Sequence, residues 1–89
     1  MVETQIEIIN RLGLHARAAA KLVHAASAHQ ASVKLVSDGE EVDAKSILGV
    51  LLLAAAQGTT LILRCDGPDE AEATAAIVEI VADRFGEGE

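Results

Sequence analysis

The sequence predicts an α+β fold in which helices cover one face of a single sheet. Three observations lead to this expectation: four short segments have strand patterns, amphipathic helical segments separate them in the order β-α-β-β-α-β-α, and an Asp-Gly pair joins the middle two strands. Two long helices can cover only one face of four strands, so the simplest architecture is an open-faced two-layer sandwich with an antiparallel or mixed sheet. This is the ferredoxin-like order of elements with an additional short helix.

The first half of the chain contains three expected strands and one helix. Residues Val2 to Ile9 alternate between apolar and polar side chains, as a half-buried strand does. A helix is expected from Ala16 to about Ala28. Strands follow at Ser32–Ser37 and Glu40–Asp43, and Asp38-Gly39 between them is typical of a hairpin turn. The apolar residues at helical spacing in the helix are Ala19, Leu22, Val23 and Ala26.

A short helix and the last strand follow in the middle of the chain. Ser46 is a suitable N-cap for a helix from Ile47 to about Leu53, and Gly58 is the expected stop signal for that helix. The segment Thr59–Cys65 is strongly apolar and predicts a buried strand.

The last helix begins with Pro68 and acidic residues that complement the helix dipole, and we expect it to run to about Phe85. The tail over 86–89, with the sequence GEGE, is expected to fray. The side chains of this helix that are expected to face the sheet are Ala73, Ile77, Ile80 and Val81.

The composition fits one domain without disulfide bonds. The 89 residues support one modest core, so residues 1–89 are expected to form a single domain. Hydrophobic residues make up 51% of the chain, but Phe85 is the only aromatic residue, so Ala, Val, Leu and Ile must build the core. Cys65 is the single cysteine, which excludes an internal disulfide, and we expect it to contribute packing rather than chemistry.

The net charge of −7 argues against nucleic acid as a partner. The charge is unevenly distributed, because the segment 8–37 has no Asp or Glu but holds four of the seven basic residues and all three histidines. This segment suits an anionic ligand or an acidic partner surface. The first residues lack the basic start of a signal peptide, and the apolar run at 47–56 is too short to span a bilayer, so we expect a cytoplasmic protein that does not enter the membrane.

His15 and Arg17 lie at the expected start of the first helix. The first backbone N–H groups of that helix lack intrahelical partners, and with the helix dipole they form an anion site with His15 at its mouth. Arg17 lies in the first turn, where its guanidinium can fork onto phosphate oxygens. The pattern suits a histidine that carries a phosphoryl group, held by Arg17 and the backbone amides of Ala16, Arg17 and Ala18. The alternative is an ordinary loop histidine beside a solvated arginine.

Other catalytic arrangements are missing from the sequence. The chain has no Ser-His-Asp set, no Cys-His pair and no Walker-type glycine loop, so a stand-alone enzyme is not expected. His24 and His29 are five residues apart, and no cysteines stand at ligand spacing, so we expect neither a metal site nor a cofactor.

The segment Asn10–Ala20, NRLGLHARAAA, resembles the active-site motif of the HPr family, the histidine-containing phosphocarrier proteins of the bacterial phosphoenolpyruvate-dependent phosphotransferase system. The resemblance covers nearly the whole chain and includes a second motif, KSILGVLLLAAAQG, at 45–58. It implies an open-faced sandwich of a four-stranded antiparallel sheet covered by three helices. One departure is Ala18, where the family usually has proline. Alanine is also a good residue for a first helical turn, so the helix start is expected to survive.

The resemblance implies a function in phosphoryl relay. His15 would accept a phosphoryl group on Nδ1 from the phosphorylated first enzyme of the system and pass it to a histidine of a downstream acceptor protein. Arg17 matches the arginine that stabilises this group. The protein would be a monomer and a transferase component. The competing hypothesis is a regulatory protein-binding module of a nitrogen-type or catabolite-control branch, with little role in sugar uptake.

Ser46 resembles the serine that an ATP-dependent kinase/phosphorylase modifies in part of the family, although it also suits an ordinary N-cap. The helix after it has too many apolar residues for one buried stripe, so some are expected to form an exposed patch beside His15. This patch and a basic rim would form a surface for docking partner proteins. The expected members of this surface are Arg17, Lys21, Lys45, Ile47, Leu48 and Leu51.

Overall fold

Four strands form one antiparallel sheet in the computed structural model, which describes residues 1–87. The strands are β1 (Val2–Glu7), β2 (Ser32–Ser37), β3 (Glu40–Asp43) and β4 (Thr60–Asp66). Their spatial order is β1-β4-β2-β3, and every neighbouring pair is antiparallel. The sheet is therefore purely antiparallel, which resolves the alternative that the segment pattern left open.

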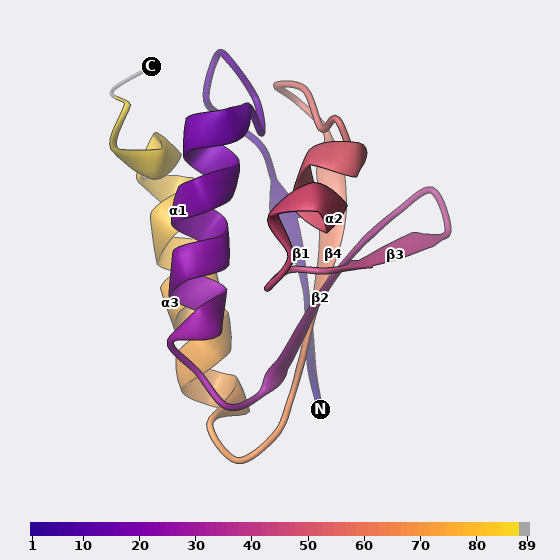
Figure 1. Ribbon diagram of the computed structural model, residues 1–89, viewed down its shortest axis with the longest axis vertical. Coiled ribbons are helices and arrows are strands. Elements are labelled where there is room, and N and C mark those ends of the chain that lie inside the picture. The colour runs from indigo at the N-terminus through magenta and orange to yellow at the C-terminus, as the bar shows by residue number, and fades with distance from the viewer. Residues whose placement is uncertain (88–89) are drawn as a thin grey trace.

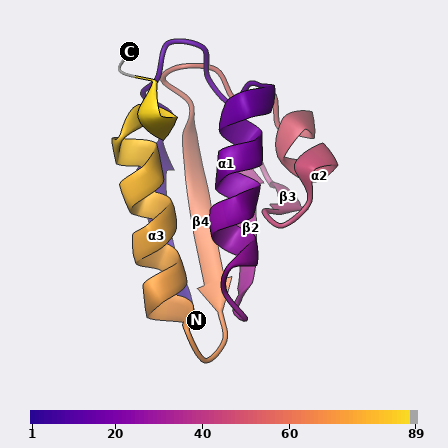
Figure 2. The ribbon, with the colours of Figure 1, turned by 60° about the vertical axis from the view of Figure 1, so that its left-hand side comes forward.

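Three helices cover one face of this sheet, as the sequence predicts (Figure 1). They are α1 (Ala16–Ser27), α2 (Ile47–Leu52) and α3 (Glu70–Ala82). Helices α1 and α3 lie side by side across the sheet, and α2 packs beside α1 near the β3 edge (Figure 2). None of the helices within residues 1–87 combines the length and the hydrophobicity needed to cross a bilayer. The open-faced two-layer sandwich is confirmed.

The core lies between the sheet and the helices. Alternate residues of β4 point into it, and Leu63 stands opposite Leu35 of β2 in the register. Leu22 of α1 and Ile77 of α3 close the core from the helical side, each fully buried. Cys65 is fully buried in this cluster, where its side chain packs among the apolar residues of the core.

Helix α2 ends where the sequence predicts, but its stop signal is a different residue. Helix α2 ends at Leu52, and Ala54, with a φ of 48°, turns the chain out of the helix in place of the expected Gly58. Gly58 instead lies in the turn before β4, where its N–H donates to the carbonyl of Ile8 at 2.7 Å. Ala54 takes this left-handed position although glycine is the usual residue there, and its N–H donates to the carbonyl of Leu51 at 3.1 Å.

Helix α3 ends at Ala82 rather than near Phe85. A short 3₁₀ turn, η1 (Arg84–Gly86), follows, and both Arg84 and Phe85 have left-handed φ angles, of 54° and 53°. This turn brings the Phe85 ring into the core, where the side chain is 1% exposed. Burial of the only aromatic side chain offsets the cost of the unusual backbone.

The expected frayed tail is wrong for its first two residues. The N–H groups of Gly86 and Glu87 donate to the carbonyls of Asp83 and Arg84 at 3.0 and 2.9 Å. Residues 88–89 of that tail lie outside the described residues. The described part of the tail lies against α1, because Glu87 pairs with His15 and the Phe85 carbonyl accepts a hydrogen bond from Lys21.

Candidate active site

His15 is the N-cap residue of α1. Its backbone is extended, with φ −73° and ψ 176°, and its carbonyl accepts the first helical hydrogen bond from Ala19 at 2.8 Å. Its imidazole does not cap the helix, and the first turn contains no acidic residue. The first amides of α1, those of Ala16, Arg17 and Ala18, therefore lack both an intrahelical acceptor and a side-chain cap.

The loop before α1 is held firmly at its base. Asn10 is fully buried, and its Nδ2 donates to the carbonyl of Gly13 at 2.8 Å. Gly13 has a φ of +68°, and a Cβ built on it would lie 2.5 Å from the carbonyl oxygen of Ala55. That same oxygen accepts the N–H of Leu14 at 2.8 Å. The close approach fixes the backbone immediately before His15 and requires a glycine at position 13.

Arg17 faces a small cavity between the start of α1 and the C-terminal segment. The cavity has a volume of about 270 Å³ and is lined by Arg11, Leu12, Arg17, Gly86 and Glu87. Arg17 is exposed, as the first-turn position predicts. The cavity therefore combines two guanidinium groups with one carboxylate next to the uncapped amides.

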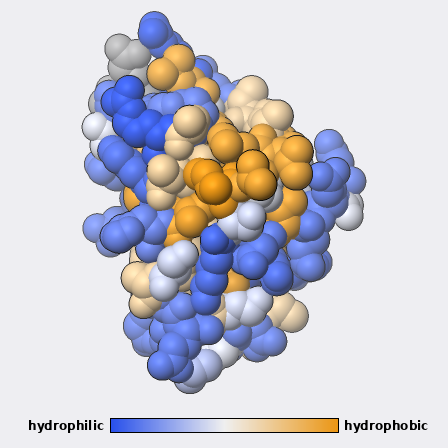
Figure 3. Space-filling model, viewed as in Figure 1, coloured by the Kyte–Doolittle hydropathy of each residue, from blue (hydrophilic) through white to orange (hydrophobic). Residues whose placement is uncertain are grey.

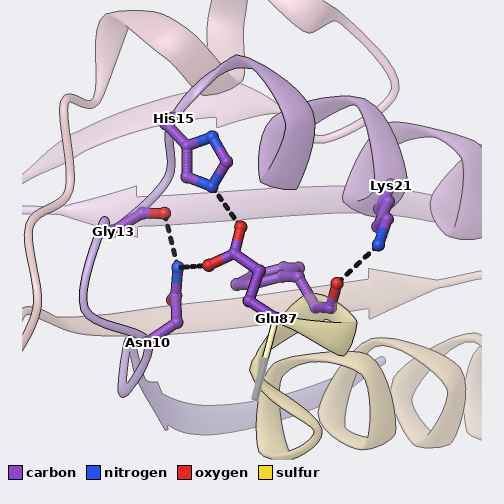
Figure 4. Close-up of polar contacts among 6 residues, drawn as sticks. Asn10, Gly13, His15, Lys21 and Glu87 are labelled. Carbon is purple, nitrogen blue, oxygen red and sulfur yellow. Dashed lines mark hydrogen bonds and ion pairs between the residues drawn. The ribbon is translucent and has the colours of Figure 1, made fainter. Parts of the chain in front are cut away.

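Glu87 is the residue of this site that sequence reasoning missed. One of its carboxylate oxygens pairs with Nε2 of His15, and the other accepts a hydrogen bond from Nδ2 of Asn10 at 3.0 Å (Figure 4). The hydrogen bond from His15 lowers the pKa of the Glu87 carboxyl, and the hydrogen bond from Asn10 and the charge of Arg17 act in the same direction. No local sequence pattern predicts this contact, because it joins residues that are 72 positions apart.

Lys21 and Lys45 each bind a backbone carbonyl within the molecule. The Lys21 ammonium donates to the carbonyl of Phe85 at 2.6 Å and so ties η1 to α1 (Figure 4). The Lys45 ammonium donates to the carbonyl of His29 at 2.8 Å. Both residues were expected as the basic rim of a docking surface, and the structure gives each of them a bond inside the fold as well.

Exposed apolar side chains gather over α2, where Figure 3 shows hydrophobic residues framed by hydrophilic ones. Ile47 is 39% exposed, and Leu48 is 71% exposed, as the sequence predicts. Leu51 differs from the expectation, because it is partly buried against the core. Leu52, at 74%, is the exposed residue in its place, and Leu12 adds a second unexpected one at 60%. Leu52 lies four residues, about one helical turn, after Leu48, which is the more exposed of the first two residues, so the outward direction falls on Leu52 rather than Leu51.

Ser46 is the N-cap of α2, as the sequence predicts. Its Oγ accepts the N–H of Gly49 at 3.2 Å, and its own carbonyl accepts from Val50 at 3.0 Å. Ser46 is partly exposed and precedes the first exposed residues of the apolar patch, Ile47 and Leu48.

The other histidines lie away from the site. His24 is exposed on α1, and His29 follows the helix, with its Nδ1 close to the carbonyl of Ala25 at 3.0 Å. Within the part of the chain that the structure describes, no three His, Cys, Asp or Glu side chains are grouped as a metal site.

Comparison with known proteins identifies the family of histidine phosphocarriers. A family model described as "PTS HPr component phosphorylation site" matches residues 2–83. The chain belongs to the HPr family.

Individual relatives agree over the full length. The phosphocarrier protein HPr of Cupriavidus necator is 53% identical over 89 residues, which cover 100% of both chains. The crystal structure of HPr-C-His from Thermoanaerobacter tengcongensis superposes with a TM-score of 0.95 at 42% identity, and the match covers 98% of each chain. A second crystal structure from that organism, of an HPr dimer, has a TM-score of 0.80 at 42% identity, and the match covers 98% of this chain and 100% of the other.

Proposed function

We propose that His15 accepts a phosphoryl group from the phosphorylated first enzyme of the phosphoenolpyruvate-dependent phosphotransferase system and passes it to a downstream acceptor protein. The observation that carries this proposal is the position of His15 at an uncapped helix N-terminus, with Arg17 in the first turn. Membership of the HPr family supplies the class of reaction. The protein is then a phosphoryl-transfer component that acts as a monomer in the cytoplasm, and it needs no cofactor.

The transfer is a displacement at phosphorus. The lone pair of Nδ1 of His15 attacks the phosphoryl group, a new N–P bond forms, and the bond from phosphorus to the donor enzyme breaks with its electron pair returning to the donor. The second transfer reverses these roles, and Nδ1 recovers its lone pair as the acceptor forms its own bond. No proton needs to leave or enter Nδ1 in either step, so the site contributes positioning and charge stabilisation.

The phosphoryl oxygens are held by groups at the start of α1. The amides of Ala16, Arg17 and Ala18 have no intrahelical acceptors, and the helix dipole favours an anion beside them. The Arg17 guanidinium lies in the same turn and can bind two oxygens at once. These groups stabilise negative charge at phosphorus throughout the transfer.

Partner proteins dock on the apolar patch over α2 in this proposal. The patch has an apolar centre and basic side chains around it, an arrangement that suits a transient interface. Leu12 and Leu52 join the surface, and Leu51 supports it from below. The partners are the first enzyme, a downstream acceptor and a serine kinase/phosphorylase that modifies Ser46. The residues expected to contact them are Arg17, Lys21, Lys45, Ile47, Leu48, Leu12 and Leu52.

Incubation with phosphoenolpyruvate and the cognate first enzyme tests the proposal. The expected result is a mass gain of one acid-labile phosphoryl group in the wild-type protein and none in His15→Ala. His24→Ala is the matched control, because His24 is exposed on the same helix and should leave the mass gain intact. A wild-type protein that gains no mass with a competent donor would contradict the proposal and favour the regulatory binding module.

A further inference from the structure

We propose that Glu87 is a positioning residue for His15, which holds the imidazole by Nε2 and thereby presents an unprotonated Nδ1 to the phosphoryl donor. The inference rests on the proposed phosphorylation of His15 and extends it to a residue from the other end of the chain. It concerns the orientation and the tautomer of the ring, and Glu87 itself touches neither the phosphoryl group nor the donor.

The contact with His15 is sheltered from solvent. The Glu87 side chain is 12% exposed and the His15 side chain is 25% exposed. A carboxylate in this position loses much of its hydration and needs hydrogen-bond donors in exchange. It finds two, Nε2 of His15 on one oxygen and Nδ2 of Asn10 on the other (Figure 4).

Asn10 fixes the position of the Glu87 carboxylate. Its side chain is fully buried, and the two hydrogens of its Nδ2 serve two acceptors, the Gly13 carbonyl and Glu87. The Gly13 carbonyl belongs to the rigid loop that precedes His15, so one amide group links that loop to the carboxylate. Reversing the amide would turn its oxygen toward two acceptors, and its orientation is therefore defined.

The backbone of the C-terminal segment supports the same arrangement. The Lys21 ammonium binds the Phe85 carbonyl at 2.6 Å, and the Phe85 ring is buried in the core. Glu87 follows two residues later and its N–H donates to the Arg84 carbonyl at 2.9 Å. The turn that delivers the carboxylate is thus anchored to α1 and to the core at Phe85, and its own hydrogen bond closes it at Glu87.

The position of the Glu87 carboxylate determines which tautomer the neutral His15 ring adopts. An ionised carboxylate only accepts hydrogen bonds, so the nitrogen that faces Glu87 must carry the proton. The lowered pKa of the Glu87 carboxyl keeps it ionised at neutral pH. In a neutral ring the other nitrogen, Nδ1, then has a free lone pair, and it lies on the side of the ring away from Glu87 (Figure 4). The pairing therefore selects the nucleophilic atom.

The same pairing persists through the transfer. When Nδ1 forms its bond to phosphorus, the proton on Nε2 remains in place and the ring gains positive character. The adjacent carboxylate stabilises that charge, and when the phosphoryl group leaves, the electron pair of the N–P bond returns to Nδ1. Glu87 neither gains nor loses a proton in this sequence.

The variant Glu87→Gln tests the inference, with Glu40→Gln as the matched control because Glu40 is exposed at the hairpin tip. The first measurement is the ¹⁵N chemical shifts of the His15 ring in the unphosphorylated protein. We expect Nε2–H in the wild type and the control. We expect a larger share of Nδ1–H in Glu87→Gln, because an amide N–H can donate to Nε2.

The second measurement is the rate of phosphoryl transfer from the phosphorylated first enzyme. The maximal rate should fall about tenfold in Glu87→Gln with KM unchanged, because the ring loses the partner that orients it while the donor still binds; about tenfold is the lower end of the loss seen when a metal-bound histidine loses such a partner. Ring shifts equal to those of Glu40→Gln, or a maximal rate that stays the same or increases, would overturn the inference while wild-type phosphorylation proceeds normally. A wild-type protein that accepts no phosphoryl group would overturn the proposed function, and this inference with it.

Discussion

The starts of α1 and α2 are built in opposite ways. At α1 the N-cap is His15, whose side chain leaves the first amides uncapped. At α2 the N-cap is Ser46, whose hydroxyl accepts the N–H of Gly49 at 3.2 Å. Both helices have first turns without acidic residues. The comparison shows that the start of α1 has no side-chain acceptor for its first donors, whereas the start of α2 satisfies one donor from within the chain.

Helix α3 is a third case, in which carboxylates occupy the positive end. Glu70 accepts the N–H of Gly67 at 3.2 Å, and Asp69 accepts those of Gln30 and Ala31 at 2.9 and 2.8 Å. These backbone hydrogen bonds lower the pKa of both carboxyls. Among the three α-helices of residues 1–87, only α1 has neither a side-chain cap nor a carboxylate in its first turn. The first turn of α1 therefore leaves its positive end uncompensated from within the helix, and the nearby carboxylate of Glu87 faces the His15 ring.

The largest expected effect comes from removing Arg17, because the start of α1 would then lose the side chain that is proposed to bind the phosphoryl oxygens. We expect Arg17→Ala to slow phosphoryl transfer to His15 by about 10²-fold, the effect of losing one charged donor at a developing negative charge. Arg17→Lys should recover only part of the rate, because an ammonium cannot form the two-pronged contact. Rapid-quench measurement of transfer from the first enzyme gives both values.

The control for Arg17 is Lys34→Ala, which removes a positive charge from the open face of the sheet. Its rate should match that of the wild type, and thermal unfolding should show that Arg17→Ala remains folded. Equal rates for Arg17→Ala and Lys34→Ala would remove Arg17 from the site.

A smaller effect is expected from Gly13, which holds the α1 start in place. Gly13→Ala combines a left-handed backbone with a Cβ 2.5 Å from the Ala55 carbonyl oxygen, whereas Gly39→Ala has a φ of +79° with no atom within 4 Å. We expect Gly39→Ala to cost about 1 kcal/mol of unfolding free energy and Gly13→Ala about 2–4 kcal/mol. Urea unfolding measures the two losses of unfolding free energy. Equal losses in Gly13→Ala and Gly39→Ala would show that the loop before His15 can shift to accommodate the added Cβ.

The sequence predicted the elements of both helix starts but only part of their surroundings. His15, Arg17 and the Ser46 cap follow from local patterns, since helix periodicity and N-cap chemistry act over a few residues. Glu87 could not be found in this way, because η1 depends on left-handed turns at Arg84 and Phe85 that no local pattern requires. The exchange of Leu51 for Leu52 has a similar origin, because a six-residue helix is too short for its pattern to define one buried stripe.

The smallest expected effect concerns the stability contributed by Ser46, which caps the start of α2. It tests the contrast between this capped helix start and the uncapped start of α1. Ser46→Ala should lower the free energy of unfolding by about 1 kcal/mol, since the N–H of Gly49 loses its acceptor. Ser46→Asp should stay within about 0.5 kcal/mol of the wild type, because aspartate is an equally good N-cap. Urea unfolding measures both, and phosphorylation of His15 in Ser46→Ala should proceed at the wild-type rate. Equal stability of Ser46→Ala and the wild type would show that the hydroxyl does not close this helix start, and the distinction between α1 and α2 would then rest on Arg17 alone.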